Sequence, residues 1–161
     1  MSSVLEYCRA LPTVRFAPGD VLLTEGDTSG KLYFLIEGEV EVIKEDYQIN
    51  LTADPGAIFG EISILLGLPH MATVRAVTAG NAYLAEDGNA FLQAHREIAY
   101  HLAKILAQRL HSVSSYLVDL KRQFEDHASH LGIVDEVLET LVHQQAEEFT
   151  PGSDRDPNTE L

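Results

Sequence analysis

Short runs of apolar residues alternate with turn-forming residues from Val14 to Ala85. The runs recur about every 8 to 12 residues, a spacing typical of antiparallel sandwiches and jelly rolls. Clusters rich in Gly, Pro and Asp separate them and interrupt regular structure. The predicted strands are Val21–Leu23, Leu32–Ile36, Val40–Ile43, Thr73–Thr78 and Asn81–Ala85; the predicted turns are Pro18–Asp20, Glu25–Gly30 and Asp54–Gly56, with Asp46 and Asn50 flanking a further hairpin.

Helical patterns flank this strand region. Val4–Leu11 is predicted to be a short helix that ends at Pro12, because proline cannot continue a helix and restrains the residue before it. A second short helix begins at Ala90–Leu92. A long helix begins at Arg96, and no Pro or Gly interrupts the sequence before Gly132.

Apolar residues along the long helix are spaced alternately four and three positions apart. This period of 3.5 residues over about five heptads is typical of a coiled coil and predicts a homodimer formed through the helix. The alternative is an amphipathic helix packed on its own barrel. A break between His127 and Gly132, giving two helices, also fits, because glycine is a poor helix former. The seam positions are Leu106, Leu110, Val113, Leu117, Leu120, Phe124, His127, Leu131, Val134, Leu138 and Leu141.

These patterns divide the chain into three predicted regions. Residues 1–92 form a β-roll with flanking short helices. Residues 93–149 form the C-terminal helix or helix pair. Residues 150–161, which contain two prolines and a glycine, form a flexible acidic tail.

One stretch, Phe59–Ala76, has the layout of a site for a small anion, and we call it the cassette. Gly60 lets the backbone approach a ligand closely, because glycine has no Cβ atom. Glu61 opens a short helix, Ile62–Leu66, which Gly67 can end. The free N–H groups at the start of a helix attract anions.

The order and spacing of these residues resemble the cyclic nucleotide-binding domains of the bacterial catabolite activator, the protein kinase A regulatory subunit and gated channels. The matching segments are Phe16–Leu22, Glu25–Asp27, Leu32–Val40, the cassette and Ala103–Leu110. The resemblance implies a mainly β fold with α-helices. This fold is an eight-stranded antiparallel β jelly roll, or double-stranded β-helix, with a short N-terminal helix and a long C-terminal helix.

The resemblance also implies a set of ligand-binding residues. The family's glutamate accepts a hydrogen bond from the ribose 2′-hydroxyl, and its match here is Glu61. A second reading of Glu61 is a carboxylate favoured only by the helix dipole. The amides of Ile62 and Ser63 would face the cyclic phosphate. The full set expected to contact a ligand is Gly60, Glu61, Ile62, Ser63, His70, Met71, Ala72 and Ser114; Ser114 has a second reading as an ordinary helix-surface serine.

The sequence departs from the family at His70. The family has an arginine nine residues after the glutamate, and its guanidinium binds the phosphate oxygens in a bidentate fork. Histidine is shorter and mostly neutral at pH 7, so it cannot reproduce that contact. Losing such a contact costs about 1.5–3 kcal/mol. Met71 lacks the hydroxyl that often meets guanine in this family, which favours cAMP over cGMP as the ligand.

Composition narrows the classes of function. The chain has 161 residues, one cysteine and a formal net charge of −14. Such an acidic chain is unsuited to nucleic acids or anionic membranes. There is no secretory signal and no apolar run of the roughly 18 residues that span a membrane. We therefore expect a cytoplasmic chain that binds no nucleic acid and no membrane.

The sequence also indicates a non-enzymatic role. His70 is the only histidine before His95, so the strands lack the clustered ligands of a jelly-roll metalloenzyme. We expect no catalytic residue, no metal and no cofactor. The predicted function is a sensory module that binds cAMP or a similar small anion and signals through its C-terminal helix to a protein partner. The alternatives are a different small ligand, or a dimeric scaffold whose ligand site is vestigial.

Overall fold

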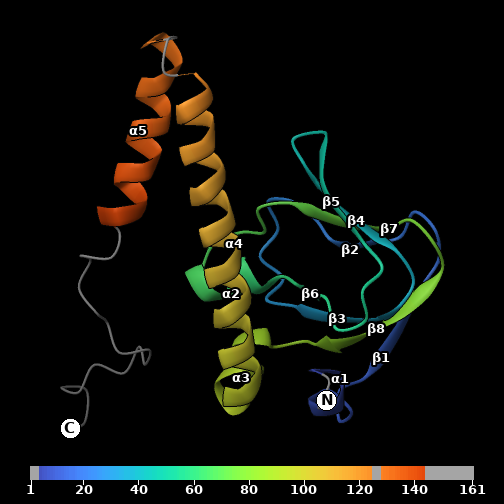
Figure 1. Ribbon diagram of the computed structural model, residues 1–161. Coiled ribbons are helices and arrows are strands. Elements are labelled where there is room, and N and C mark those ends of the chain that lie inside the picture. Colours follow the sequence, from blue (N-terminus) through green and yellow to red (C-terminus); the bar gives the residue numbers. More distant parts are fainter. Residues whose placement is uncertain (1–3, 125–127, 144–161) are drawn as a thin grey trace, which may run out of the picture. The chain divides into compact units, whose positions relative to one another are not determined.

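The computed structural model describes residues 4–124 and 128–143, which belong to two compact units, residues 1–103 and 104–161. The boundary falls inside helix α4. None of the described helices is both long and apolar enough to cross a membrane. The elements, shown in Figure 1, are α1 (Val4–Tyr7), β1 (Thr13–Phe16), β2 (Val21–Leu23), β3 (Leu32–Glu37), β4 (Val40–Lys44), β5 (Tyr47–Thr52), β6 (Ile58–Phe59), α2 (Glu61–Leu66), β7 (Thr73–Ala76), β8 (Gly80–Ala85), α3 (Gly88–Ala94), α4 (Arg96–Gln123) and α5 (Ala128–His143).

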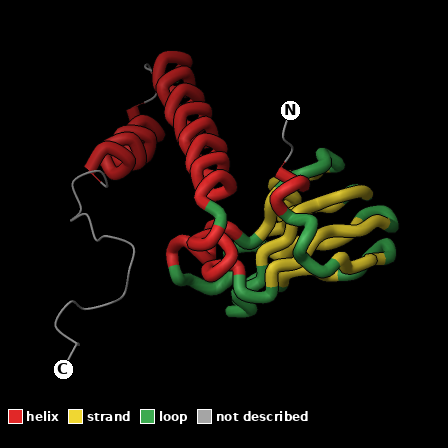
Figure 2. Tube along the Cα trace, turned by 90° about the horizontal axis from the view of Figure 1, so that it is seen from below, coloured by secondary structure: helices red, strands yellow, loops and turns green. Residues whose placement is uncertain are grey.

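The first unit is an eight-stranded jelly roll. One sheet has the strand order β1-β8-β3-β6 and the other has the order β2-β7-β4-β5, and every pairing is antiparallel. Figure 2 shows the strands gathered into this roll. The strand orders mean that the chain crosses repeatedly between the two sheets. The predicted fold class is confirmed.

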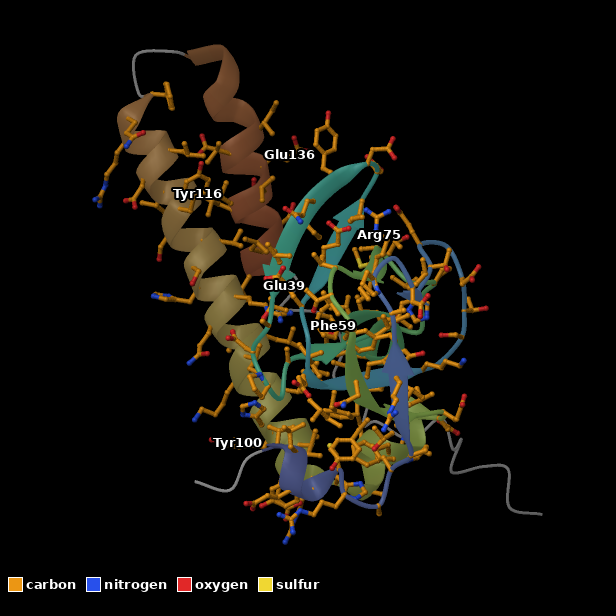
Figure 3. The ribbon with its side chains drawn as sticks, turned by 90° about the vertical axis from the view of Figure 1, so that its right-hand side faces the viewer. Glu39, Phe59, Arg75, Tyr100, Tyr116 and Glu136 are labelled. Atoms are coloured by element: carbon orange, nitrogen blue, oxygen red, sulfur yellow. The ribbon has the colours of Figure 1, made fainter. Side chains whose placement is uncertain are left out.

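The core lies between the two sheets, and its composition follows from the alternation of side chains along each strand. Phe59, labelled in Figure 3, lies among these inward side chains, whereas Arg75 lies on the outer side. The buried cluster contains Phe16, Leu23, Tyr33, Leu35, Val40, Phe59, Val74, Ala76, Ala82 and Leu84.

Strand β3 is buried on both faces, which explains why Leu32–Ile36 reads as a continuous apolar run. Tyr33 and Leu35 face the core between the sheets. Phe34, on the opposite face, is fully buried, and its ring meets that of Phe91 on α3 edge to face with centroids 5.5 Å apart. Helix α3 therefore covers the outer side of β3.

Several element boundaries differ from those expected. Helix α1 ends at Tyr7, well before Pro12, because the chain then turns so that the Leu11 amide donates to the Cys8 carbonyl. The hairpin after β4 turns at Glu45 and Asp46, which both have positive φ. Asn50, expected beside that turn, lies within β5, and β7 ends at Ala76 rather than Thr78.

The second unit contains two helices rather than one continuous rod. Helix α4 ends at Gln123 and α5 begins at Ala128, so Gly132 lies inside α5. Helix α5 turns back beside α4, and Lys121 of α4 forms an ion pair with Asp135 of α5. The expected seam is thus divided between two helices. His127, the side chain of Leu131 and the predicted tail, residues 150–161, lie outside the described residues.

Candidate functional site

Gly60 joins strand β6 to helix α2 and holds a conformation that favours glycine. Its φ is 97° and its ψ is −3°, in the left-handed region, and it caps the N-terminus of α2. A Cβ atom here would lie only 2.4 Å from the carbonyl oxygen of Lys31. The cassette backbone therefore lies against the segment that leads into β3. The missing Cβ atom of Gly60 was instead expected to admit a ligand, and that contact stays a prediction.

Helix α2 spans Glu61–Leu66 and ends at Gly67, whose φ of 64° forms a left-handed cap. The Gly67 amide donates to the Ile64 carbonyl, and the Leu68 amide donates to the Ser63 carbonyl. These bonds match the predicted helix and its stop. They direct the chain back toward the roll, which places His70 close to the first turn of α2.

The His70 ring is buried, with only 4% of the residue exposed, and both ring nitrogens have hydrogen-bond partners. Nε2 lies 2.6 Å from Ser29 Oγ, and Nδ1 lies 2.8 Å from Ser63 Oγ. The Ser63 hydroxyl also donates to the carbonyl oxygen of Gly60 over 3.0 Å. The ring thus links the loop before β3 to the start of α2.

These bonds assign the proton positions on a neutral ring. Since the Ser63 hydroxyl donates to Gly60, its oxygen is left to accept the proton on Nδ1. Nε2 is then the acceptor and receives the Ser29 hydroxyl proton. The Ser29 oxygen in turn accepts the Lys31 amide at 3.3 Å. When His70 is uncharged, each of these hydrogen-bonded groups has a donor or acceptor role that fits its partners.

Burial lowers the pKa of His70 below its usual value, and the negative charge of Asp27 opposes this effect only in part. The cause is the loss of hydration that a charged ring would suffer inside the protein. The lowered pKa and the bonds to the two serines both favour a neutral ring.

This environment makes stability depend on pH. An unfolded histidine titrates near pH 6.5, and the folded pKa of His70 is lower, so below about pH 6.5 the unfolded chain binds more protons. We expect His70 to contribute stability above that pH and to lose it as the pH falls through the folded pKa. Thermal melts of the wild type and His70→Gln from about pH 8 to about pH 5 test this. The stability difference between them should shrink with falling pH; parallel curves would contradict it.

The loop between β2 and β3 holds the cassette in place through backbone bonds. The Gly26 amide donates to the His70 carbonyl at 2.9 Å, and the His70 amide donates to the Asp27 carbonyl at 2.8 Å. Sequence reasoning missed the role of this loop and of Ser29. The only indication in the sequence was that Glu25–Asp27, within this loop, is one of the segments that match the family. Ser29 gave no such indication, because it lies 41 residues from its histidine partner.

The structure brings some of the predicted site residues together and separates others. Gly60, Ser63 and His70 are joined by hydrogen bonds, and Glu61 is buried beside them at the start of α2. The side chains of Ile62 and Met71 are 37% and 44% exposed, and Ala72 is half-buried. Ser114 lies on α4 in the second unit, and its contact with a ligand stays a prediction.

Arg75 does not replace the missing arginine. It lies on β7, and its guanidinium binds Glu41 of β4, with Nη2 2.6 Å and Nε 2.8 Å from the same carboxylate oxygen. That bond lowers the pKa of Glu41. Arg75 lies on the outer side of the sheet, away from the buried cluster (Figure 3).

Comparisons with known proteins address the family and the fold of this chain. The family model of the cyclic nucleotide-binding domain matches residues 13–95. A cAMP-dependent protein kinase regulatory subunit of Hypocrea atroviridis is 39% identical over 83 residues, 48% of this chain and 18% of that protein. A cyclic nucleotide-gated potassium channel of Rhizobium etli is 30% identical over 110 residues, 67% of this chain and 30% of that protein. The chain thus spans less than a third of these relatives' lengths.

A solved structure gives the same result at the level of fold. The N-terminal domain of a transcriptional regulator from Streptomyces coelicolor superimposes with a TM-score of 0.50 at 27% identity, covering 68% of this chain and 82% of that one. The family match includes all eight strands, the cassette and α3. Because it extends over more than half of the sequence, this chain belongs to the cyclic nucleotide-binding domain family.

Proposed function

We propose that this chain is a regulatory, non-catalytic module that binds a small ribose-bearing ligand at the cassette and signals its occupancy through α4 to a protein partner. The cassette supports this role most directly. It combines the left-handed Gly60, the buried Glu61 and the capped helix α2 at family spacing. A ligand acts on such a module by binding one conformation more tightly than another.

Cyclic AMP is the reference ligand for this proposal. Met71 offers no hydroxyl to a guanine amine, which favours adenine over guanine. Because His70 replaces the arginine that would bind the phosphate, we expect cAMP to bind weakly. Titration calorimetry with cAMP and cGMP measures both points.

Replacing His70 by arginine is expected to tighten cAMP binding by about tenfold or more, because a charge-assisted contact to the phosphate is worth about 1.5–3 kcal/mol. Calorimetry on both proteins checks this, with thermal melts to confirm that the variant folds. Leu68→Arg is a matched control. Leu68 is 51% exposed in the same cassette, and the substitution adds the same charge at another position. Equal tightening in both variants would mean that only the added charge matters.

The proposed module is a homodimer formed through its second unit. Several apolar side chains on these helices are exposed in the single chain, where burial against a second copy would be favourable. They are Leu110, Val113, Tyr116 and Val118 on α4, Phe124 directly after it, and Ile133 and Val137 on α5.

The double substitution Leu110→Asp and Val113→Asp is expected to weaken dimerisation by about a hundredfold or more, since each would bury a carboxylate. Sedimentation equilibrium over a range of concentrations measures this. Ser115→Asp is the control, because Ser115 is an exposed polar residue of the same helix. A wild type that stays monomeric at about 0.1 mM would contradict the proposal.

A second candidate is a dimeric scaffold that binds no ligand. The observation that favours it is the His70 ring, whose two nitrogens are already bonded within the protein. Titration calorimetry with cAMP and cGMP also distinguishes the scaffold from the ligand-binding module. A scaffold gives no heat with any ribose-bearing ligand at about millimolar concentration and still dimerises.

A further inference from the structure

The cassette holds no positive charge where the family binds phosphate. The segment from Phe59 to Ala72 contains no lysine or arginine. Its one basic side chain, His70, is buried, and both ring nitrogens bond to serine hydroxyls. The ring can offer a donor to a ligand only by breaking one of these bonds, which would leave a buried serine without its partner.

Two cations, Lys31 beside Gly60 and Arg75 near the end of the cassette, are engaged elsewhere. The Lys31 carbonyl lies against Gly60, but the Lys31 ammonium is 4.0 Å from the carboxylate of Glu86. Arg75 binds Glu41 on the outer face of the sheet. Neither side chain takes the place of the family's arginine in this structure.

Two carboxylates add negative charge to the surroundings of His70 and α2. Glu61 contributes a buried carboxylate at the first position of α2. The charge of Asp27 acts on His70 from the loop between β2 and β3. A phosphate added here would bring a third negative charge, and like charges close together in a poorly hydrated site repel strongly.

A nucleoside and its cyclic nucleotide differ in net charge and in the number of ribose hydroxyl donors. A 3′,5′-cyclic phosphate carries one negative charge, and its 3′ and 5′ oxygens are esterified, so only the 2′-hydroxyl of its ribose donates. The nucleoside is neutral and has three ribose hydroxyls that donate. A site rich in carboxylates and poor in cations pairs better with donors than with an anion.

We infer that the cassette selects an uncharged nucleoside over the cyclic nucleotide of the same base. This inference rests on the ligand-binding role proposed above and specifies the class of ligand. His70 is then a specificity-determining residue: by occupying the arginine position with a ring bonded to Ser29 and Ser63, it removes the contact that would stabilise a phosphate.

Titration calorimetry of the full chain with adenosine, cAMP, guanosine and cGMP tests the inference at about pH 7.5, where the histidine is neutral. For adenine, guanine or both, the nucleoside should bind about tenfold more tightly than the cyclic nucleotide of the same base. This is a difference of about 1.4 kcal/mol in binding free energy. His70→Arg should tighten the cyclic nucleotide about tenfold without tightening the nucleoside. Leu68→Arg should leave the wild-type preference in place.

The outcomes distinguish this inference from the function on which it rests. Suppose that cAMP binds at least as tightly as adenosine and that cGMP binds at least as tightly as guanosine. The inference is then wrong, and the ligand-binding role stands. If none of the four ligands binds at about 1 mM, both are wrong and the scaffold remains. The wild-type comparison alone decides between these results, even if His70→Arg does not fold.

Discussion

Replacing Gly60 by alanine is expected to destabilise the first unit by about 3 kcal/mol or more and to abolish ligand binding. Two costs add. Alanine at a φ of 97° is strained by about 1–3 kcal/mol. In addition, its Cβ would lie 2.4 Å from the Lys31 carbonyl oxygen, so the backbone of one segment must move. That movement would displace the start of α2, where the Ser63 hydroxyl binds the Gly60 carbonyl.

Gly19→Ala separates these two costs. Gly19 has a φ of 88°, but a Cβ atom there would meet nothing within 4 Å. Urea unfolding of both variants should show a loss at Gly19 that reflects strain alone, with a loss at Gly60 about 2 kcal/mol larger. Equal losses would show that the segment around Lys31 yields easily and that the close approach at Gly60 does not define the site.

The jelly roll could be predicted from sequence because its signals are local. Turn residues and period-two strands mark most boundaries without knowledge of the partner strands. The hairpin before β5 was misplaced because its turn, at Glu45 and Asp46, uses positive φ without glycine. The register shift between Val42 and Ile43 likewise explains why β4 departs from strict alternation there.

The site could be predicted only in part, because its backbone is local and its polar network is not. Gly60, Glu61 and Gly67 act at the two ends of the six-residue helix α2, so their spacing was enough. His70 was found as a departure from a pattern, but its burial and its bond to Ser29 depend on tertiary packing. No periodicity in a single sequence reports such a contact.

The break between α4 and α5 shows a similar limit. The heptad spacing continues through the break, so periodicity predicted one long seam. The structure instead turns α5 back beside α4, and the ion pair between Lys121 and Asp135 links the two helices. Apolar spacing reports which face of a helix seeks a partner; it does not report whether that partner lies in the same chain.

Replacing Glu61 by glutamine is expected to weaken binding of a ribose-bearing ligand by about 10- to 150-fold, because a hydrogen bond to a charged acceptor is worth about 1.5–3 kcal/mol. The family resemblance implies that Glu61 accepts the ribose 2′-hydroxyl. Its burial at the start of α2 is consistent with that role. The exchange keeps the shape of the side chain and removes its charge. Calorimetry with the tightest-binding ligand of the wild type measures the effect.

The 2′-deoxy form of the same ligand gives the decisive control, because it lacks the hydroxyl in question. Wild type and Glu61→Gln should bind the deoxy ligand with affinities within about threefold of each other, so that the loss appears only with the ribose form. If the substitution weakens both forms equally, Glu61 does not contact the 2′-hydroxyl. A carboxylate that serves only the helix dipole makes a different prediction: a loss of about 0.3–1 kcal/mol in stability and no selective loss in binding. The four titrations and one unfolding curve for each protein therefore decide between a ligand contact and a helix-stabilising charge.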